Sequence, residues 1–351
     1  MMHHGEYKVV GGKLVVVDLE AINGTITDVS LNGDFFLEPD EALEDLNEAV
    51  RGLSTDASHG TIRDAVTNNL REDAVMFGFD ADAVARVVRR ALGHATKWED
   101  HEWEILGPEI IPITEQVALD EVLTRQIAKG VRKPAIRFWD WNEGAVVIGS
   151  FQSLKNEVDM EQADKYGIQV VRRISGGGAM FMEAGNCITY SLYAPESLVD
   201  GMSFADSYPF LDAWVMEALQ NIGLKAHYKP LNDIATEAGK IGGAAQKRFA
   251  NGAMLHHVTM SYDIDAQKMT QVLRIGREKI SDKGITSAVK RVDPLKSQTD
   301  LERMEIIQVM MDTFAQRTGA KQAQLDDATR QAAQELAETK FATEAWTRRV
   351  P

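Results

Sequence analysis

The sequence predicts an α+β protein with a small N-terminal unit and a larger domain in which strands and helices are mixed. Short strand-like segments separated by glycine and asparagine turns fill the start of the first unit, and three amphipathic helices follow. From residue 110 to about 319, β-branched runs alternate with helical periodicity. The 351 residues are 44% apolar and 26% charged, a composition typical of globular proteins with a substantial core.

The small unit is expected to span residues 1–95. Its strands are predicted at residues 7–10, 13–19, 25–31 and 35–37, and its helices at 40–50, 59–70 and 80–92. This stretch contains no candidate nucleophile, no metal-ligand cluster and no phosphate-binding loop. We therefore interpret residues 1–95 as an accessory domain.

The larger domain is expected over residues 110–319, after a polar, tryptophan-containing linker at 96–109. Helices are predicted at 114–129, 159–166 and 206–222, and strands at 136–139, 145–148, 169–173 and 187–192. A further helix is expected at 302–318, at the end of this domain. Residues 320–351 are expected to form a C-terminal segment with a helix at 323–339.

Composition excludes several classes of protein. The formal charge of −15 opposes general binding of nucleic acid, and no apolar run approaches the length of a membrane span. The single cysteine, Cys187, excludes an internal disulfide, a four-cysteine zinc site and an iron–sulfur cluster. The N-terminus shows no basic-then-apolar leader, so a cytoplasmic protein is expected.

Three successive glycines, Gly176 to Gly178, follow two arginines and a serine in the segment 170–181. Glycines let the backbone approach a ligand closely, and Arg172 and Arg173 offer cationic donors for a phosphate or carboxylate. The segment matches neither the GxxxxGK[ST] nor the GxGxxG motif. It predicts either an anion cradle or a flexible glycine turn with solvated arginines.

Three further positions are candidates for chemistry. Lys240 lies among small residues, where it could neutralise a phosphate and polarise a carbonyl, although a surface lysine beside a turn fits the pattern too. His256 and His257 are adjacent on a predicted strand, so their side chains should point to opposite faces. They are a poor pair for one metal, and structural histidines are the alternative. Cys187 lies on a probable strand without a neighbouring base, which disfavours a nucleophilic role.

Taken together, these segments resemble the lipoate–protein ligases, which share a superfamily with biotin ligases and octanoyltransferases. The resemblance covers about residues 105–319, and the chain departs from the family pattern at Met182 and Val258. It rests on the ordered motifs Arg172-Arg173-x-Ser175-Gly176-Gly177-Gly178, Gly185-Asn186, Asn232-Asp233, Lys240-Ile241-x-Gly243-x-Ala245 and His256-His257.

The resemblance implies a large biotin/lipoate-ligase-type catalytic domain and an ATP-dependent ligase. Such an enzyme activates lipoate or octanoate as acyl-AMP with ATP and Mg²⁺ and transfers the acyl group to a lysine. Lys240 would be catalytic, and the metal ligands are unassigned. The residues implied to bind ATP and the acyl-adenylate are Arg173, Ser175, Gly176, Gly177, Gly178, Asn186, Asn232, Asp233, Gly243, Ala245, His256 and His257.

The implied acceptors are lipoyl domains of 2-oxoacid dehydrogenase complexes or the H protein of glycine cleavage, with no nucleic-acid or membrane partner. Such acceptors tend to be acidic, so a local basic face is expected. Its candidates are Lys283, Lys290, Arg291 and Lys296, and a solvated charge run is the alternative.

Two other functions stay open. A cysteine-dependent octanoyl- or lipoyltransferase would need no ATP, and a non-catalytic acyl-binding module would need no activation chemistry at all. The transferase requires a cysteine near the lysine segment, where this chain has none. A biotin ligase is disfavoured because a GRGR-type loop is absent.

The small unit resembles the accessory domain of these ligases, which usually follows the catalytic domain or is a separate chain. Here it comes first, so the chain resembles a circular permutation. Because permutations succeed where termini lie close together, residues 346–351 are expected beside the strand at 7–10.

Overall fold

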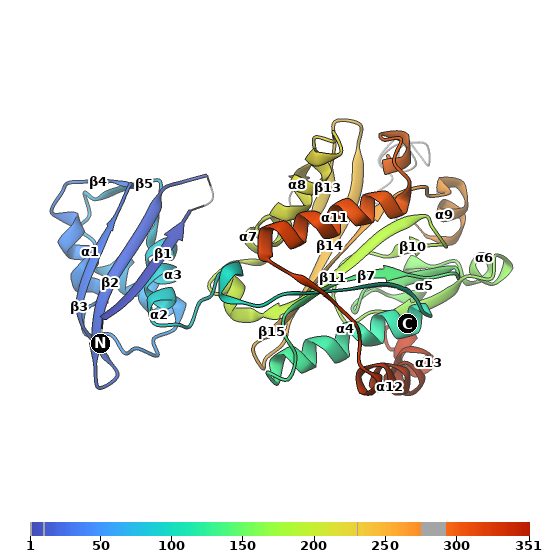
Figure 1. Ribbon diagram of the computed structural model, residues 1–351, viewed down its shortest axis with the longest axis horizontal. Helices are drawn as coiled ribbons and strands as arrows, with labels where there is room; N and C mark the ends of the chain where they lie inside the picture. Colours follow the sequence, from blue (N-terminus) through green and yellow to red (C-terminus); the bar gives the residue numbers. More distant parts are fainter. Residues whose placement is uncertain (1, 10, 230, 275–292) are drawn as a thin grey trace. The chain divides into compact units, whose positions relative to one another are not determined.

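A computed structural model describes residues 2–9, 11–229, 231–274 and 293–351, and the chain divides into two compact units (Figure 1). One unit contains the residues up to Asp100 together with Ser197–Ser203, and the other contains His101–Glu196 and Phe204–Pro351. Within the described part of the chain, no helix combines the length and apolar character that crossing a membrane requires.

The small unit packs helices against a three-stranded antiparallel sheet of order β1-β2-β3. Alternate residues of β2 point into its core, where Val15, Val17 and Leu19 meet the buried valines of α3. The α+β prediction is confirmed here. The elements are β1 (Met2–Lys8), β2 (Leu14–Ile22), β3 (Thr25–Gly33), β4 (Phe36–Glu38), α1 (Ala42–Val50), α2 (His59–Asn69), β5 (Val75–Phe77) and α3 (Ala81–Ala91).

The large unit is built on an eight-stranded mixed sheet of order β12-β13-β14-β15-β11-β7-β6-β16, with a second sheet of order β10-β8-β9. The predicted α+β class with mixed sheets and helices is confirmed. Its elements are β6 (Glu104–Ile110), α4 (Ile113–Ala128), β7 (Ala135–Asp140), β8 (Ala145–Ile148), α5 (Leu154–Glu157), α6 (Met160–Lys165), β9 (Gln169–Arg172), β10 (Met180–Met182), β11 (Cys187–Pro195), α7 (Phe204–Leu211), α8 (Ala213–Asn221), β12 (His227–Lys229), β13 (Asp233–Ala235), β14 (Lys240–Arg248), β15 (Ala253–Ser261), α9 (Ala266–Val272), α11 (Arg303–Thr318), β16 (Lys321–Ala323), α12 (Asp327–Leu336) and α13 (Glu344–Thr347).

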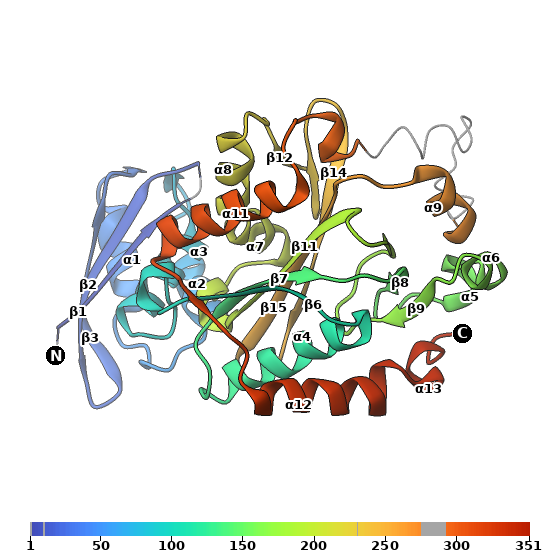
Figure 2. The same ribbon diagram turned by 45° about the vertical axis from the view of Figure 1, so that its right-hand side comes forward.

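Helices cover both faces of the large sheet, and alternation along β11 shows which helix covers which face (Figures 1 and 2). The Tyr190 ring packs against Trp214 of α8, with ring centroids 5.0 Å apart. Three residues later, Tyr193 points to the other face and donates a hydrogen bond to Asp120 of α4. We call these the α8 face and the α4 face.

Several elements differ from the sequence predictions. Residues 104–109, expected within the linker, belong to β6, which pairs in parallel with β7 and β16. The helix expected at 206–222 is divided into α7 and α8 around Asp212, with Pro209 inside α7. The helix expected from residue 323 begins at Asp327, because Lys321–Ala323 pair with β6.

The C-terminal tail packs on the large unit through Arg172. The fully buried guanidinium donates hydrogen bonds to the carbonyl oxygens of Thr347 and Val350, and the Trp346 indole donates to the Arg172 carbonyl at 2.7 Å. The guanidinium of Arg172 therefore donates its hydrogen bonds to backbone carbonyls of the chain itself. The expected proximity of residues 346–351 to the strand at 7–10 stays a prediction.

Candidate active site

The glycine segment after β9 is held in place by the buried guanidinium of Arg173. Its Nη2 donates to the carbonyls of Gly176 and Gly178, at 2.6 and 2.8 Å, and Nη1 donates to Val147 of β8 at 3.1 Å. Its Nε donates to Ser175 Oγ at 3.0 Å. Burial lowers the pKa of Arg173 to about 10, so the group stays charged at neutral pH. Arg173 is therefore buried and bonded to the glycine bend, and it is not the solvated arginine that the alternative interpretation assumes.

Close approach of two chain segments explains why glycines are required here. A Cβ placed on Gly149 would lie 2.2 Å from the carbonyl oxygen of Gly177, a distance that no side chain tolerates. Gly177 itself has a φ of +92°, which strongly favours glycine. The bend therefore packs backbone to backbone against the end of β8 and exposes main chain rather than side chains.

Behind the bend lies a buried group of three hydrogen-bonded side chains, those of Ser175, His257 and Asp120. We call this group the relay. Ser175 Oγ lies 2.6 Å from His257 Nε2, and His257 Nδ1 lies 2.9 Å from Asp120 Oδ2. Ser175 Oγ accepts from Arg173 and can donate its proton to His257 Nε2. In that tautomer His257 Nδ1–H donates to Asp120, and the imidazole is neutral.

Electrostatics agree with that protonation pattern. Burial lowers the pKa of His257 below its ordinary value, and nearby Arg173 lowers it further, while Asp120 acts in the opposite sense. Burial alone would raise the pKa of Asp120, but hydrogen bonds from His257 and Tyr193, with the charge of Arg137, hold it below the ordinary value. The relay therefore contains an ionised carboxylate and a neutral imidazole at neutral pH.

Lys240 begins β14 beside a second small-residue stretch. Its Nζ lies 2.7 Å from Asp233 Oδ1 of β13, and both side chains are partly exposed. A Cβ on Gly243 would lie 3.6 Å from the Lys240 Nζ, so the glycine leaves the ammonium group accessible. Asn232 stabilises the end of β14 near Lys240, because its Nδ2 donates a hydrogen bond to the Ala244 carbonyl at 2.6 Å.

Residues of the glycine bend, the relay and the Lys240 stretch line one cavity of about 220 Å³. Its polar wall contains cationic, amide and imidazole groups, and its other wall is apolar. Its volume is below the ~300–1,000 Å³ of typical ligand pockets. Of the predicted site residues, those that line this cavity are Arg173, Gly178, Asn232, Lys240, Gly243, Ala245 and His257; the apolar lining includes Met180, Phe181, Cys187, Ile241, Ile264 and Leu273.

Six predicted residues are absent from the cavity lining. Four of them adjoin residues that line it: Ser175, Gly176, Gly177 and Asp233. The other two, His256 and Asn186, make their contacts elsewhere. His256 points to the α8 face, as strand alternation requires, and its Nε2 lies 2.7 Å from Asp212 Oδ1. Asn186 lies in the turn before β11, where its Oδ1 accepts from the Glu183 amide and its own carbonyl accepts from Tyr262. Both residues organise surrounding structure.

Cys187 lines the apolar wall, where it is 1% exposed. Burial raises the pKa of its thiol to about 12, and the thiol lies 3.6 Å from the Phe181 carbonyl. A thiol with this pKa supplies almost no thiolate at neutral pH, which disfavours a nucleophilic role for Cys187.

Two other parts of the prediction concern the basic face and the metal ligands. Of the residues proposed for a basic face, Lys283, Lys290 and Arg291 fall outside the described residues, and Lys296 pairs with Asp263 at 2.6 Å. In the described ranges, no group of three or more His, Cys, Asp or Glu side chains could hold a metal ion.

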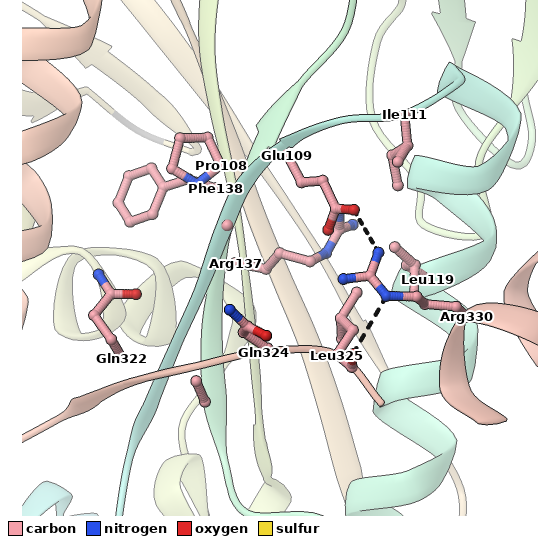
Figure 3. A pocket seen from close by; sticks show the side chains of 12 residues that line it. Pro108, Glu109, Ile111, Leu119, Arg137, Phe138, Gln322, Gln324, Leu325 and Arg330 are labelled. Atoms are coloured by element: carbon pink, nitrogen blue, oxygen red, sulfur yellow. Dashed lines mark hydrogen bonds and ion pairs between the residues drawn. The ribbon is translucent and has the colours of Figure 1, made fainter. Parts of the chain in front are cut away.

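A larger cavity of about 490 Å³ lies between β6, β7, α4 and the segment before α12 (Figure 3). Pro108, Phe138 and Leu325 line it, and Arg330 crosses its mouth to pair with Glu109 at 2.5 Å. It contains none of the predicted site residues, and its ion pair is already satisfied. We therefore place the chemistry in the smaller cavity.

Sequence reasoning missed Asp120, the carboxylate on which the relay depends. The available signal was its position: Asp120 interrupts the buried face of α4 between Val117 and Leu123. A carboxylate in an otherwise apolar helix stripe needs a buried partner. Its partners come from β7, β11 and β15, which only the assembled sheet brings together.

Comparison with known proteins identifies the family of the chain. The family model of the lipoyl protein ligase A/B catalytic domain matches residues 112–315. A probable lipoate-protein ligase A of Mycoplasma pneumoniae is 28% identical over 243 residues, covering 69% of this chain and 70% of that protein. An octanoyltransferase LipM of Halalkalibacterium halodurans is 25% identical over 258 residues, covering 66% of this chain and 92% of the relative.

Comparison with solved structures also finds lipoate-protein ligases. A bipartite lipoate protein ligase from Thermoplasma acidophilum, described with its E2 lipoyl domain, is 28% identical with a TM-score of 0.64, covering 72% of this chain and 98% of the other. A lipoate-protein ligase A bound with ATP is 25% identical with a TM-score of 0.61, covering 71% and 100%. The chain belongs to the lipoyl protein ligase A/B family.

Proposed function

We propose that the protein is an ATP-dependent lipoate–protein ligase. In the first step, a carboxylate oxygen of lipoate or octanoate attacks the α-phosphorus of ATP, and pyrophosphate leaves. In the second step, the amine of an acceptor lysine attacks the carbonyl carbon of the acyl-AMP. The bond to the phosphate oxygen breaks, AMP leaves and the amine loses a proton. The acceptors would be lipoyl domains or the related H protein, and the setting cytoplasmic.

One observation carries this proposal: Lys240 and Gly178, the last glycine of the bend, line the same cavity. The first step brings two anions together, and the negative charge on the phosphate and carbonyl oxygens must be stabilised as they react. Lys240 supplies a flexible cation, and Gly243 leaves space beside it. The bend is held rigidly by Arg173, so it offers preorganised main chain.

The relay has a positioning role in this proposal. Ser175 and Arg173 share a hydrogen bond, and His257 holds the serine from the other side. A ligand that contacts the bend would therefore meet groups whose orientation depends on Asp120. The apolar wall around Phe181 and Leu273 would receive the hydrocarbon part of the acid.

Mg²⁺ would accompany ATP and neutralise phosphate charge. Because Mg²⁺ is commonly bound by one or two carboxylates together with substrate phosphates, a preformed protein cage is not required. Asp233 is the carboxylate beside Lys240. We assign no metal ligands.

The second candidate is an acyltransferase that forms a thioester without ATP, because octanoyltransferases are among the relatives. That reaction requires a reactive thiolate. The only cysteine of the sequence is Cys187, which is buried and has a raised pKa. This argues against the transferase.

Pyrophosphate release tests the proposal directly. The purified chain is incubated with ATP, Mg²⁺ and lipoate, then octanoate, without any acceptor. Acid-dependent pyrophosphate release supports the ligase. Acyl transfer from an octanoylated carrier protein without ATP would support the transferase, and acid binding without either activity would support a binding module.

A further inference from the structure

A shallow hollow of about 400 Å³ on the large unit carries five cationic side chains and one carboxylate. We call the five the cationic rim; the carboxylate is Glu121. This concentration of positive charge contrasts with the chain as a whole, whose formal charge is −15. The rim consists of Arg125, Lys247, Arg248, Lys340 and Arg349.

An exposed aromatic side chain accompanies the rim. Phe151 follows β8 and is 75% exposed, among the most exposed of the large apolar side chains. Trp346 lies beside it in the hollow and is covered by cations, with Lys340 Nζ 4.2 Å and the Arg349 guanidinium 4.4 Å from its ring. Arginine and aromatic side chains are enriched in protein interfaces.

The hollow adjoins the candidate active site. A Cβ on Gly176 would lie 3.8 Å from the Phe151 ring, so the exposed phenylalanine rests against the glycine bend. The Ser150 amide donates to the Ser175 carbonyl at 2.8 Å, and Arg349 donates to Ser150 Oγ at 3.1 Å. A partner seated on the rim would therefore lie next to the reacting groups.

The rim is only partly neutralised from within. Glu121 pairs with Arg125 at 2.6 Å and with Lys340 at 2.5 Å, and it is one carboxylate beside five cations in the lining of the hollow. Lys247 lies over the Phe249 ring, and Arg349 is held over Trp346. These contacts orient the cations without removing their charge.

We propose that the cationic rim and Phe151 form the docking surface for an acidic protein domain that presents the acceptor lysine. The inference rests on the proposed ligase function. Complementary charge would align the acceptor and raise its association rate, despite the repulsion expected from the acidic chain. Phe151 would supply an apolar contact beside the bend.

Two steps of the reaction are measured separately to test the proposal. The variants are Phe151→Ser and Arg349→Glu, and Lys321→Glu on edge strand β16 is a matched charge-reversal control. Adenylation is followed as lipoate-dependent pyrophosphate release with hydroxylamine as a small acceptor. Transfer is followed with the apo form of an acidic E2 lipoyl domain.

We expect each rim variant to adenylate lipoate at the parental rate and to raise the KM for the lipoyl domain by about tenfold, because charge and apolar contacts at an interface act on association and retention. The parental KM should rise with salt, and that of Arg349→Glu should rise less. The Lys321→Glu variant should match the parent in both steps.

Several outcomes would overturn the docking surface while leaving the ligase intact. Normal adenylation with an unchanged KM for the lipoyl domain is one. An equal rise in KM for the Lys321→Glu control is another, since it would show an effect of net charge alone. Loss of adenylation in a rim variant would assign the hollow to the acid or nucleotide. Absence of lipoate-dependent pyrophosphate release in the parent would instead refute the proposed function.

Discussion

Two adjacent histidines on β15 make similar contacts and differ in position. His257, on the α4 face, bonds to Asp120 and Ser175, and it lines the cavity that holds Lys240. His256, on the α8 face, bonds to Asp212, which also accepts from the hydroxyls of Tyr190 and Tyr228. Both imidazoles are buried, and both are paired with a buried carboxylate.

The comparison teaches that burial and residue type do not distinguish the two histidines. They differ in that only His257 lines the cavity, which is why the proposed function assigns it a role. On the α8 face the carboxylate's three donors are side chains of the fold, so the cluster stabilises the packing of α7 and α8 against the sheet. On the α4 face the hydrogen bonds run from Asp120 through His257 and Ser175 to Arg173, which holds the glycine bend. A ligand bound at the bend would therefore depend on their alignment.

The largest effect is expected from Lys240→Ala, which removes the cavity's flexible cation. Adenylation should fall by about 10²–10³-fold, the usual cost of losing one stabilising donor in a transition state. The Lys240–Asp233 pair is partly exposed, so thermal stability should change little. Pyrophosphate release and thermal denaturation give the two readouts. Parental adenylation by this variant would show that Lys240 is not catalytic.

The next largest effects are expected when each histidine is replaced by glutamine, one on the rate of adenylation and the other on stability. His257→Gln should lower adenylation by about 10–100-fold, because Ser175 and the bend lose their aligned partner. His256→Gln should lower the free energy of unfolding by about 1–3 kcal/mol, because Asp212 loses a buried donor. Its rate at saturating substrate, measured at a temperature where the variant is folded, should match the parent.

A kinetic effect of the His256 substitution would contradict this difference between the two faces. If His256→Gln lost adenylation while fully folded, as judged by near-ultraviolet circular dichroism, the α8 face would also serve catalysis. Asp120→Asn is a useful companion, because it should reproduce the kinetic loss of His257→Gln without touching the cavity wall.

A smaller effect is expected in the pH dependence of stability. The pKa of His257 is lowered in the folded protein, so the unfolded chain binds its proton more readily. The folded state is therefore destabilised as pH falls below the ordinary value of about 6.5, by up to about 1.4 kcal/mol per pH unit. Urea unfolding between pH 5 and 7.5 should show a shallower dependence in His257→Gln. Identical slopes would contradict a neutral His257.

The smallest effect is expected from Cys187→Ser. The thiol packs against the apolar wall of the cavity, so adenylation and ATP-dependent transfer should stay within about twofold of the parent, with a modest loss of stability from the added hydroxyl. Rate measurements with and without ATP give the result. Complete loss of transfer, with folding intact, would revive the thioester mechanism.

Local patterns predicted much of the fold. The α4 helix was expected at 114–129 and spans Ile113–Ala128, and the strand at Ala145–Ile148 was predicted with its observed bounds. The divided helix at Asp212 and the strand β16 were not predictable, because both depend on partners distant in the sequence. Asp212 interacts with Tyr190 and His256, and Lys321–Ala323 form a strand only beside β6.

The sequence alone determined the local chemistry: three glycines that free the backbone, a lysine among small residues, and two histidines that a strand must direct to opposite faces. Only the tertiary structure decided which histidine meets the cavity and that Arg173 orders the bend. It also supplied Asp120 as the relay's carboxylate. The physical reason is that strand alternation fixes directions within one segment, whereas the neighbour that lies in each direction depends on how distant segments pair and pack.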